Sequence, residues 1–135
     1  MIEEYHFGSI TIDEKTYNHD VEVRWTGAAS GDTRGEPSPS GLEVLKWWRK
    51  EGHFVYPEDI KRAIEENPEV IIIGTGESDV MKVSQKVKKE IKSKGIELII
   101  DITPEAIKTF NVIQEESEEE EGRKKKVIGL FHLTC

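Results

Sequence analysis

The fold is decided by residues 70–102, which read VIIIGTGESDVMKVSQKVKKEIKSKGIELIIDI. The stretch opens with an apolar run at residues 70–73, which is typical of a strand buried on both faces of a sheet. A second apolar run follows at residues 96–102. Between the two runs, apolar side chains recur at helical spacing, at Val80, Val83, Val87 and Ile91. The order strand, helix, strand predicts a right-handed parallel crossover.

Turn residues predict where this helix begins and ends. Gly74-Thr75-Gly76 follows the first strand. Ser78 or Asp79 is the expected N-cap, because short polar side chains accept hydrogen bonds from the first helical amides. Gly95 is expected to end the helix, since glycine readily adopts the positive φ found at that position.

The alternation of helix and strand continues to residue 135. Thr103 and Pro104 predict the N-cap and first turn of another helix, with inward side chains at Ala106, Ile107, Phe110 and Ile113. Residues 115–126 are a charged run, first acidic and then basic, which predicts a solvated connection. Residues 127–135 predict a final apolar strand.

The residue pattern in the first half of the chain mainly predicts β-strands. Residues 5–25 are rich in β-forming side chains, and residues 13–15 predict a hairpin turn. Residues 26–41 predict a long loop, because glycine, proline and small polar residues dominate them. Residues 42–55 fit a helix and a strand equally well and are left open. Pro57 predicts the first turn of a short helix that ends at Asn67-Pro68.

These elements predict one domain over residues 1–135. Its fold class is α/β: a layered single domain with a central mixed β-sheet, parallel βαβ crossovers in the C-terminal half and an antiparallel N-terminal β-hairpin. A length of 135 residues is usual for one domain.

Composition narrows the classes of function. The formal net charge of -8 argues against nucleic acid as a partner. The sequence has no run of 18 apolar residues and no apolar leader, so we expect no membrane partner. A single cysteine excludes an internal disulfide and suits the reducing cytoplasm. Charged residues make up 34% of the chain, mostly Glu and Lys, which is typical of thermophile proteins.

The turn after the first strand is the strongest candidate for a ligand site, because α/β proteins bind ligands where the carboxyl ends of parallel strands meet. Six residues are candidates for ligand binding: Gly74, Thr75, Gly76, Ser78, Asp101 and Thr103. However, Asp79 replaces the third glycine of the dinucleotide motif G-x-G-x-x-G, and the turn lacks the lysine of a P-loop. Glu77 and Asp79 would also repel a phosphate. We therefore favour a structural turn and expect no cofactor.

Catalytic and metal-binding patterns are weak. Ser78 nearly fits the nucleophile elbow G-x-S-x-G, but Val80 replaces the second glycine, so a cap is the better interpretation. The four histidines lack the spacing of a zinc site. Cys135 has no base beside it in the sequence and is not expected to be catalytic. We therefore expect no catalytic residue and no metal.

Two other stretches are candidate contact surfaces. Trp47, Trp48 and Arg49 are residue types enriched at interface hot spots, with one tryptophan expected in the core and the other exposed. Six lysines crowd residues 82–94 and could bind an acidic partner. Given the net acidity of the chain, a solvated lysine face is the favoured interpretation.

Several short stretches together carry a resemblance. They are residues 5–10 (YHFGSI) with Tyr17 and Asp20, residues 47–53 (WWRKEGH), residues 70–76 (VIIIGTG), residues 95–97 (GIE), Thr103, Ala106, Phe110-Asn111, Arg123 and residues 131–135 (FHLTC). In this order they resemble the small family of uncharacterised function that includes the adipogenesis-associated domain-containing protein and a mitochondrial complex I assembly factor. The resemblance implies a layered α/β fold with a central mixed sheet. It carries over no settled enzyme activity and no catalytic residue.

Two functions remain after these exclusions. The first is a non-enzymatic binding or assembly module with a protein partner, for which homo-oligomerisation stays open. The alternative is a small-ligand binder or an enzyme, with its site at the loops of residues 74–78 and 101–103. The absence of paired catalytic groups in the sequence favours the first.

Overall fold

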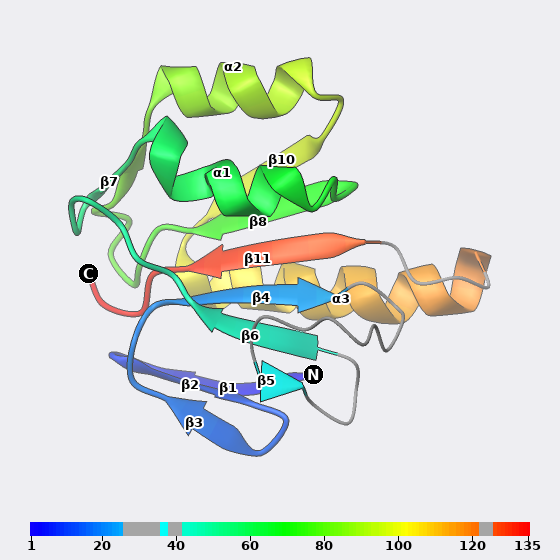
Figure 1. Ribbon diagram of the computed structural model, residues 1–135. Coiled ribbons are helices and arrows are strands. Elements are labelled where there is room, and N and C mark those ends of the chain that lie inside the picture. Colours follow the sequence, from blue (N-terminus) through cyan, green and yellow to red (C-terminus); the bar gives the residue numbers. More distant parts are fainter. Residues whose placement is uncertain (26–35, 38–41, 122–125) are drawn as a thin grey trace.

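The computed structural model describes residues 1–25, 36–37, 42–121 and 126–135, and at its centre lies a β-sheet with helices on both faces (Figure 1). In these described ranges, six strands form this sheet in the order β10-β8-β11-β4-β6-β5. In the same order, their bounds are Glu97–Asp101, Val70–Gly74, Val127–Phe131, Val21–Trp25, Leu42–Lys46 and Glu36–Pro37.

Strand direction divides this sheet into two halves. β8 pairs in parallel with both of its neighbours, so that Val70 lies opposite Glu97 of β10 and Val127 of β11. β4 runs antiparallel to β11 and to β6. The sheet is therefore mixed, and the predicted α/β fold class with parallel strands in the C-terminal half is confirmed.

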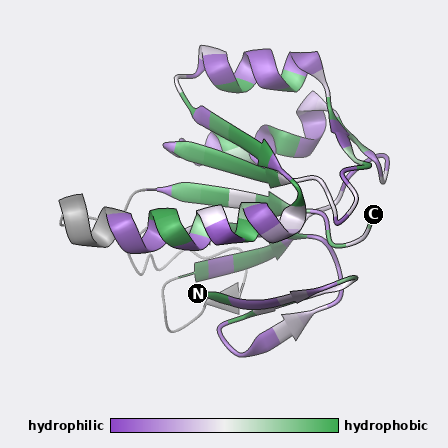
Figure 2. Cartoon of the chain, turned by 180° about the vertical axis from the view of Figure 1, so that it is seen from behind, coloured by the Kyte–Doolittle hydropathy of each residue, from purple (hydrophilic) through white to green (hydrophobic). Residues whose placement is uncertain are grey.

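Within the described residues, three helices cover the two faces of the sheet. α1 (Pro57–Glu65) and α2 (Gln85–Ser93) lie on one face, and α3 (Thr103–Glu121) lies on the other (Figure 1). Alternate side chains of β8 enter different cores: Ile71 and Ile73 pack on the α1 and α2 side, and Val70 and Ile72 on the α3 side. Figure 2 shows the central strands mostly in the green of hydrophobic residues and α2 mostly in purple. Burial on both faces explains why every position of residues 70–73 is apolar.

The N-terminal strands form a separate antiparallel sheet, as the sequence predicts. It consists of β1 (Ile2–His6), β2 (Ser9–Ile12) and β3 (Lys15–Tyr17) in that order. Between β2 and β3, Asp13 and Glu14 have φ values of 48° and 72°, as a tight two-residue hairpin turn requires. Ile2, Ile10 and Ile12 are buried in the core on the α3 side.

Residues 42–55, which fitted two structures, contain no helix. They form β6 and then β7 (Phe54–Val55), which pairs in parallel with the short strand β9 (Lys82–Val83). The strand alternative is therefore correct for residues 42–46. Of the predicted loop at residues 26–41, only β5 belongs to the described residues.

The predicted start of α2 at Ser78 or Asp79 is wrong. The helix begins at Gln85, and the hydroxyl of its N-cap Ser84 accepts a hydrogen bond from the amide of Val87 at 3.2 Å. Val80 is 41% exposed and does not belong to a buried helical stripe. The segment before Ser84 is extended because β9 pairs with β7, a contact between distant segments that local spacing does not reveal. The predicted end of α2 at Gly95 is confirmed by a φ of 74°.

Two further predictions, the N-cap at Thr103 and the connection over the acidic run, differ from the structure of α3. Thr103 is the first residue of the helix, and its hydroxyl bonds to the amide of Gly76 and the carbonyl of His132 instead of capping its own helix. The acidic run does not form a connection up to Glu121, because α3 extends to that residue. Ala106, Ile107 and Phe110 are buried, as expected from their spacing. None of the helices in the described ranges is long and apolar enough to span a membrane.

A buried ion-pair network joins β4 to α1. Glu22 and Arg24 are only 1% and 2% exposed, and Arg24 Nε donates to Glu22 Oε2 at 2.6 Å. From the helix side, Arg24 Nη1 donates to Glu66 Oε1 at 2.9 Å, and Arg62 Nε donates to Glu22 Oε1 at 3.1 Å. Buried charges require such partners, because an unpaired charge in the interior is strongly destabilising.

Gly129 provides a test of packing on the α3 side. A Cβ at this position would overlap the Phe131 ring, 2.6 Å from its Cε2, and would lie 3.1 Å from Phe110 Cδ2. These two buried rings pack edge to face with centroids 5.9 Å apart. We expect Gly129→Ala to lower the free energy of unfolding by about 1–3 kcal/mol, as overpacking does. Urea denaturation measures the change, and Gly52→Ala, where a Cβ meets nothing within 4 Å, is the control.

Candidate functional site

The structure brings together the two loops that the sequence places at the carboxyl ends of β8 and β10. The amide of Thr75 donates to the carbonyl of Asp101 at 2.9 Å. The amide of Gly76 donates to Thr103 Oγ1 at 2.9 Å, and the amide of Thr103 donates back to the carbonyl of Gly76 at 3.0 Å. α2 and α3 follow these strands on opposite faces, so the loops form a topological switch point. Ser78 lies exposed in the same turn.

The chain itself fills this switch point. Residues 132–135 follow β11 and run past both loops: Thr103 Oγ1 donates to the carbonyl of His132 at 2.6 Å, and the amide of Glu77 donates to the carbonyl of Thr134 at 2.8 Å. Gly76 has a φ of 99°, and a Cβ there would lie 2.6 Å from the carbonyl oxygen of Thr134. The glycine is therefore needed for close packing against the chain's own backbone. The amides of Gly76 and Glu77, which a phosphate would use, already have partners.

A second group of polar residues lies at the same end of the sheet, around Asp20. Asp20 precedes β4 and His132 follows β11, and these strands pair so that Val21 lies opposite Phe131. Asp20 Oδ2 is 2.8 Å from His132 Nδ1 and 2.7 Å from Arg49 Nη2. Asp20 Oδ1 accepts a hydrogen bond from the amide of Leu133 at 2.8 Å. The carboxylate therefore binds the segments after β6 and β11 to the start of β4.

The shared oxygen fixes the tautomer of His132. Its Nδ1 and Arg49 Nη2 are 3.1 Å apart, and both lie within hydrogen-bond distance of Asp20 Oδ2. An ionised carboxylate can only accept hydrogen bonds, so Nδ1 carries the hydrogen that it donates to Asp20 Oδ2, and Arg49 Nη2 donates to the same oxygen. In the neutral ring, Nε2 is then the acceptor nitrogen, and it lies 3.4 Å from Thr134 Oγ1.

Asp20 is held in its ionised form. Burial alone would raise its pKa above the ordinary value of 3.8. Hydrogen bonds from His132 and the amide of Leu133, together with the charge of Arg49, outweigh burial and lower the pKa of Asp20. The carboxylate is therefore a charged anchor at neutral pH.

Arg49 and Trp47 are buried beside Asp20. The Arg49 side chain is 5% exposed, and its guanidinium carbon lies 4.4 Å from the centre of the Trp47 ring. Trp47 is 4% exposed and donates from Nε1 to the carbonyl of Asp59 at 3.0 Å. Trp48, in contrast, is 71% exposed. The sequence correctly expects one core and one exposed tryptophan, but Arg49 and Trp47 do not form a surface patch with Trp48.

Cys135 has a neighbour that the sequence does not predict. Its Sγ is 3.6 Å from Nε2 of His53, whose ring packs edge to face with His132 at 5.8 Å between centroids. The local sequence places no base beside this cysteine, and the neighbour comes from a residue 82 positions away. That Cys135 is not catalytic stays a prediction. Among the described residues, no three side chains of the His, Cys, Asp and Glu types gather as metal ligands.

Sequence reasoning did not single out Asp20, His132 or His53 as site residues. The available signal was indirect: Asp20 and His132 each adjoin a strand, and the pairing of those two strands brings them together. The two residues are 112 positions apart in the chain, so no local motif contains both.

The family to which the chain belongs is shown by a match over most of its length. A family model described as a protein of unknown function (DUF498/DUF598) matches residues 2–124. The chain belongs to this family. As a DUF498/DUF598 protein it shares the family's fold, and the match assigns a role to none of the residues around Asp20 or the switch point.

Solved structures similar to this DUF498/DUF598 protein agree in fold. A conserved hypothetical protein from Pyrococcus horikoshii OT3 is 25% identical, with 100% of this chain and 99% of that chain covered and a TM-score of 0.70. A Xanthomonas campestris protein is 20% identical, with 98% and 83% covered and a TM-score of 0.68. An outer membrane protein from Bartonella henselae is 21% identical, with 99% and 94% covered and a TM-score of 0.66. These similarities establish the fold and name no activity.

The Asp20 anchor predicts a pH dependence of stability. A carboxylate whose folded pKa is lowered contributes stability above its unfolded pKa and loses it as the pH falls through the folded value. At neutral pH we expect Asp20→Asn to lower the free energy of unfolding by about 1.5–3 kcal/mol, the range for a hydrogen bond to a charged group. Below pH 3.8 the difference in the free energy of unfolding between the variant and the native protein should shrink. Urea denaturation from pH 3 to 7 measures it, with the exposed Glu97→Gln as control. A difference that does not change with pH would contradict this assignment.

The filled switch point predicts that nucleotides do not bind. Because the amides of Gly76 and Glu77 already donate to Thr103 and Thr134, a phosphate would have to displace residues 132–135. We expect NAD, FAD and ATP to leave the Tm unchanged. A ligand at a hundredfold excess over its Kd would stabilise the protein by about 2.7 kcal/mol, a shift that thermal denaturation readily detects. Saturable binding in a calorimetric titration would refute the prediction.

Proposed function

We propose that the protein is a non-enzymatic binding or assembly module that recognises a protein partner through Trp48. The observation that carries the proposal is the exposure of this side chain, 71%, next to Trp47, which is 4% exposed. Tryptophan contributes strongly to interface hot spots, and a large exposed aromatic side chain gains free energy when a partner covers it. The residues on either side of Trp48 are fixed, because the Trp47 indole N–H donates to the carbonyl of Asp59 and the Arg49 guanidinium pairs with Asp20.

The surroundings of Trp48 favour a basic side chain from the partner. A hollow of about 210 Å³ is lined by Glu22, Trp47, Trp48, Glu58, Asp59 and Arg62. Arg62 is already paired with Glu22, and Glu58 has no ion-pair partner among the described residues. A lysine or arginine entering this hollow would stack on the Trp48 indole and pair with Glu58. The net charge of -8 supports a basic protein surface over nucleic acid or an anionic membrane.

Two further expectations belong to this proposal. The first is that the family includes the adipogenesis-associated protein and a mitochondrial complex I assembly factor, as the resemblance implies, although the assembly role of those relatives is not evidence for this chain. The unpaired Cys135 supports a cytoplasmic location. The thermophilic origin suggested by composition fits the buried network of Glu22, Arg24 and Arg62, because ion-pair networks contribute more at high temperature.

A second candidate is a small-ligand binder or enzyme at the same end of the sheet. Its support is the Asp20–His132 pair, with two nitrogens of Arg49, Nε and Nη1, that are buried without a hydrogen-bond partner. Unsatisfied buried donors are uncommon, and a ligand could satisfy them. The burial of His132, which is 4% exposed, favours a structural role for this pair.

A photo-crosslinking experiment tests the role of Trp48. Benzoylphenylalanine placed at position 48 should crosslink a discrete basic protein in an extract of the source cells. The matched control is the same group at Val112, an exposed apolar site on α3 that is 47% accessible. Position 112 should give no such product.

The captured partner then permits a quantitative test. Trp48→Ala should weaken its binding by about thirtyfold, near 2 kcal/mol, and should leave the Tm unchanged because the side chain is exposed. Glu58→Lys should weaken binding as well, since it reverses the charge that receives the basic side chain. If position 48 crosslinks no more than position 112, and a substrate screen finds turnover that His132→Asn abolishes, the second candidate is correct.

A further inference from the structure

We propose that the outer edge of β10, with the lysine-lined groove along α2, binds an extended acidic segment of a partner protein as an added strand. This surface is separate from Trp48 and goes beyond the function proposed above. β10 (Glu97–Asp101) is an edge strand, paired with β8 alone within the described part of the chain (Figure 1). An edge strand presents unpaired N–H and C=O groups, which is the feature that strand addition requires.

The hydrogen bonds of β10 show which of its backbone groups face outward. The amide of Glu97 donates to the carbonyl of Glu69 at 3.1 Å, and the carbonyl of Asp101 accepts from Thr75 at 2.9 Å. Residues 97, 99 and 101 therefore direct their amides and carbonyls toward β8. By the alternation of a strand, Leu98 and Ile100 direct theirs outward. Two donors and two acceptors are thus available along the edge.

The side chains beside these groups form an apolar groove bordered by lysines. Leu98 and Ile100 point to the α2 side, where a hollow of about 480 Å³ is lined by Lys88, Lys92, Ile96, Leu98 and Ile100. Ile100 is 37% exposed, which is unusual for isoleucine in a strand flanked by helices. Lys88 is half-buried, so it is not part of a simple solvated face. The six lysines of residues 82–94 had two interpretations: a basic face for an acidic partner, and a solvated face, which the net charge favoured. The half-buried Lys88 supports the basic face for an acidic partner.

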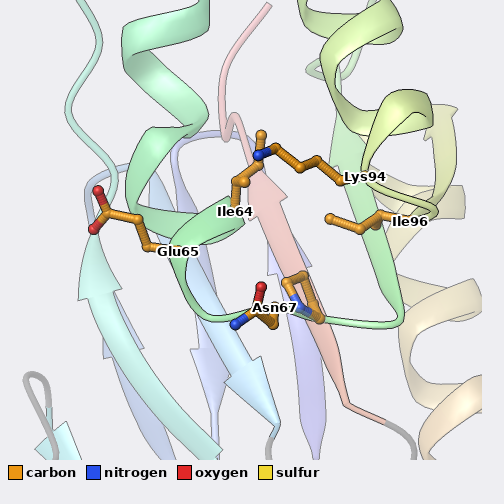
Figure 3. Close-up of a pocket in the computed structure, with 6 residues that line it drawn as sticks. Ile64, Glu65, Asn67, Lys94 and Ile96 are labelled. Carbon is orange, nitrogen blue, oxygen red and sulfur yellow. The ribbon is translucent and has the colours of Figure 1, made fainter.

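A neighbouring hollow lies near the start of β10, between the ends of α1 and α2. This hollow of about 310 Å³ is lined by Ile64, Glu65, Asn67, Pro68, Lys94 and Ile96, so that Ile96 borders both hollows. Figure 3 shows the Lys94 side chain extending from the end of α2 toward Ile64 of α1. Lys88 and Lys92 therefore border the hollow along β10, and Lys94 borders the neighbouring one. A strand of about five to seven residues, near 3.3 Å per residue, fits beside β10.

Charge selects the occupant of this groove. Lysines on the α2 side favour acidic side chains on one face of the added strand. On the opposite face of β10, Glu97 and Asp101 flank Ile99 and disfavour acidic neighbours. The segment should therefore alternate, acidic toward α2 and apolar toward α3. A second copy of this chain fits poorly, because antiparallel self-pairing about Ile99 would place Glu97 opposite Asp101 of the copy, twice.

A synthetic peptide tests strand addition directly. The probe is a fluorescent seven-residue peptide of alternating glutamate and valine with blocked ends, and fluorescence anisotropy measures its binding to the full chain. A peptide of alternating lysine and valine should not bind. Two further probes are N-methylated on alternate amides, and only the set whose amides face β10 should lose binding. Equal binding of both N-methylated probes would overturn strand addition.

Charge-reversal variants locate the groove. Lys88→Glu with Lys92→Glu should weaken binding of the glutamate probe by about tenfold, since two ion pairs become repulsive. The matched control is Lys86→Glu with Lys89→Glu, on the same helix but outside the groove lining. Equal effects of the two pairs would overturn the proposal, as diffuse attraction would then explain binding.

A backbone variant tests the hydrogen bonds of the β10 edge independently of the lysine charges. Ile100→Pro removes an outward-facing N–H without breaking the ladder to β8, and proline is tolerated at such edge positions. It should abolish binding while the circular dichroism spectrum and Trp48-dependent crosslinking stay unchanged. Sedimentation of the native chain completes the test. A dimer that Ile100→Pro dissociates would show that the occupant is a second copy and would overturn the proposed acidic partner.

Discussion

The carboxylate of Asp20 is the contact on which the end of the molecule depends. It accepts hydrogen bonds from His132, from the amide of Leu133 and from Arg49, and so joins the start of β4 to the segments that follow β11 and β6. The carbonyl of Leu133 in turn accepts from the amide of Gly8 at 2.8 Å and from the Tyr5 hydroxyl at 3.0 Å. Burial, with the charges of Glu77 and Asp20, raises the pKa of Tyr5 to about 12, so the hydroxyl remains a donor. The N-terminal sheet is thereby tied to the same segment.

This anchoring decides what the switch point can do. In α/β folds the crevice between strands whose helices leave on opposite faces is the usual ligand site. Here residues 132–135, held by Asp20, occupy that crevice and satisfy the polar groups of Thr103 and Glu77. A phosphate would compete with backbone contacts that the fold itself needs. The two proposed recognition surfaces lie elsewhere: Trp48 follows β6, and β10 is the edge strand beside β8.

Charge is used differently inside the protein and on its surface. Glu22 and Arg24 are buried on β4, and the partly exposed Arg62 pairs with Glu22 from α1, so each charge has a partner. Such a network costs desolvation and specifies one arrangement of helix on sheet, since a misplaced α1 would leave buried charges unpaired. On the surface, the lysines of α2 lie beside apolar side chains of β10 and give that groove a positive charge. The overall charge of -8 conceals this local basic strip.

The sequence by itself determined the elements whose cause is local. The apolar run at residues 70–73 specifies a doubly buried strand, Gly95 ends α2 because of its positive φ, and Pro57 begins α1. The apolar spacing within α3 likewise predicts its buried face, although not its length, since nothing in the local pattern stops the acidic residues from continuing the helix.

Only the tertiary structure decided the features that depend on distant partners. α2 begins at Gln85 and not near Ser78, because β9 pairs with β7 from another part of the chain. Trp47 is buried in the core on the α1 and α2 side, where its indole N–H donates to the carbonyl of Asp59, whereas Trp48 is exposed. Asp20 and His132 meet through the pairing of β4 with β11. Propensity and periodicity act over a few residues, whereas the burial and hydrogen bonds that assemble a site join segments far apart in sequence, so no local pattern records them.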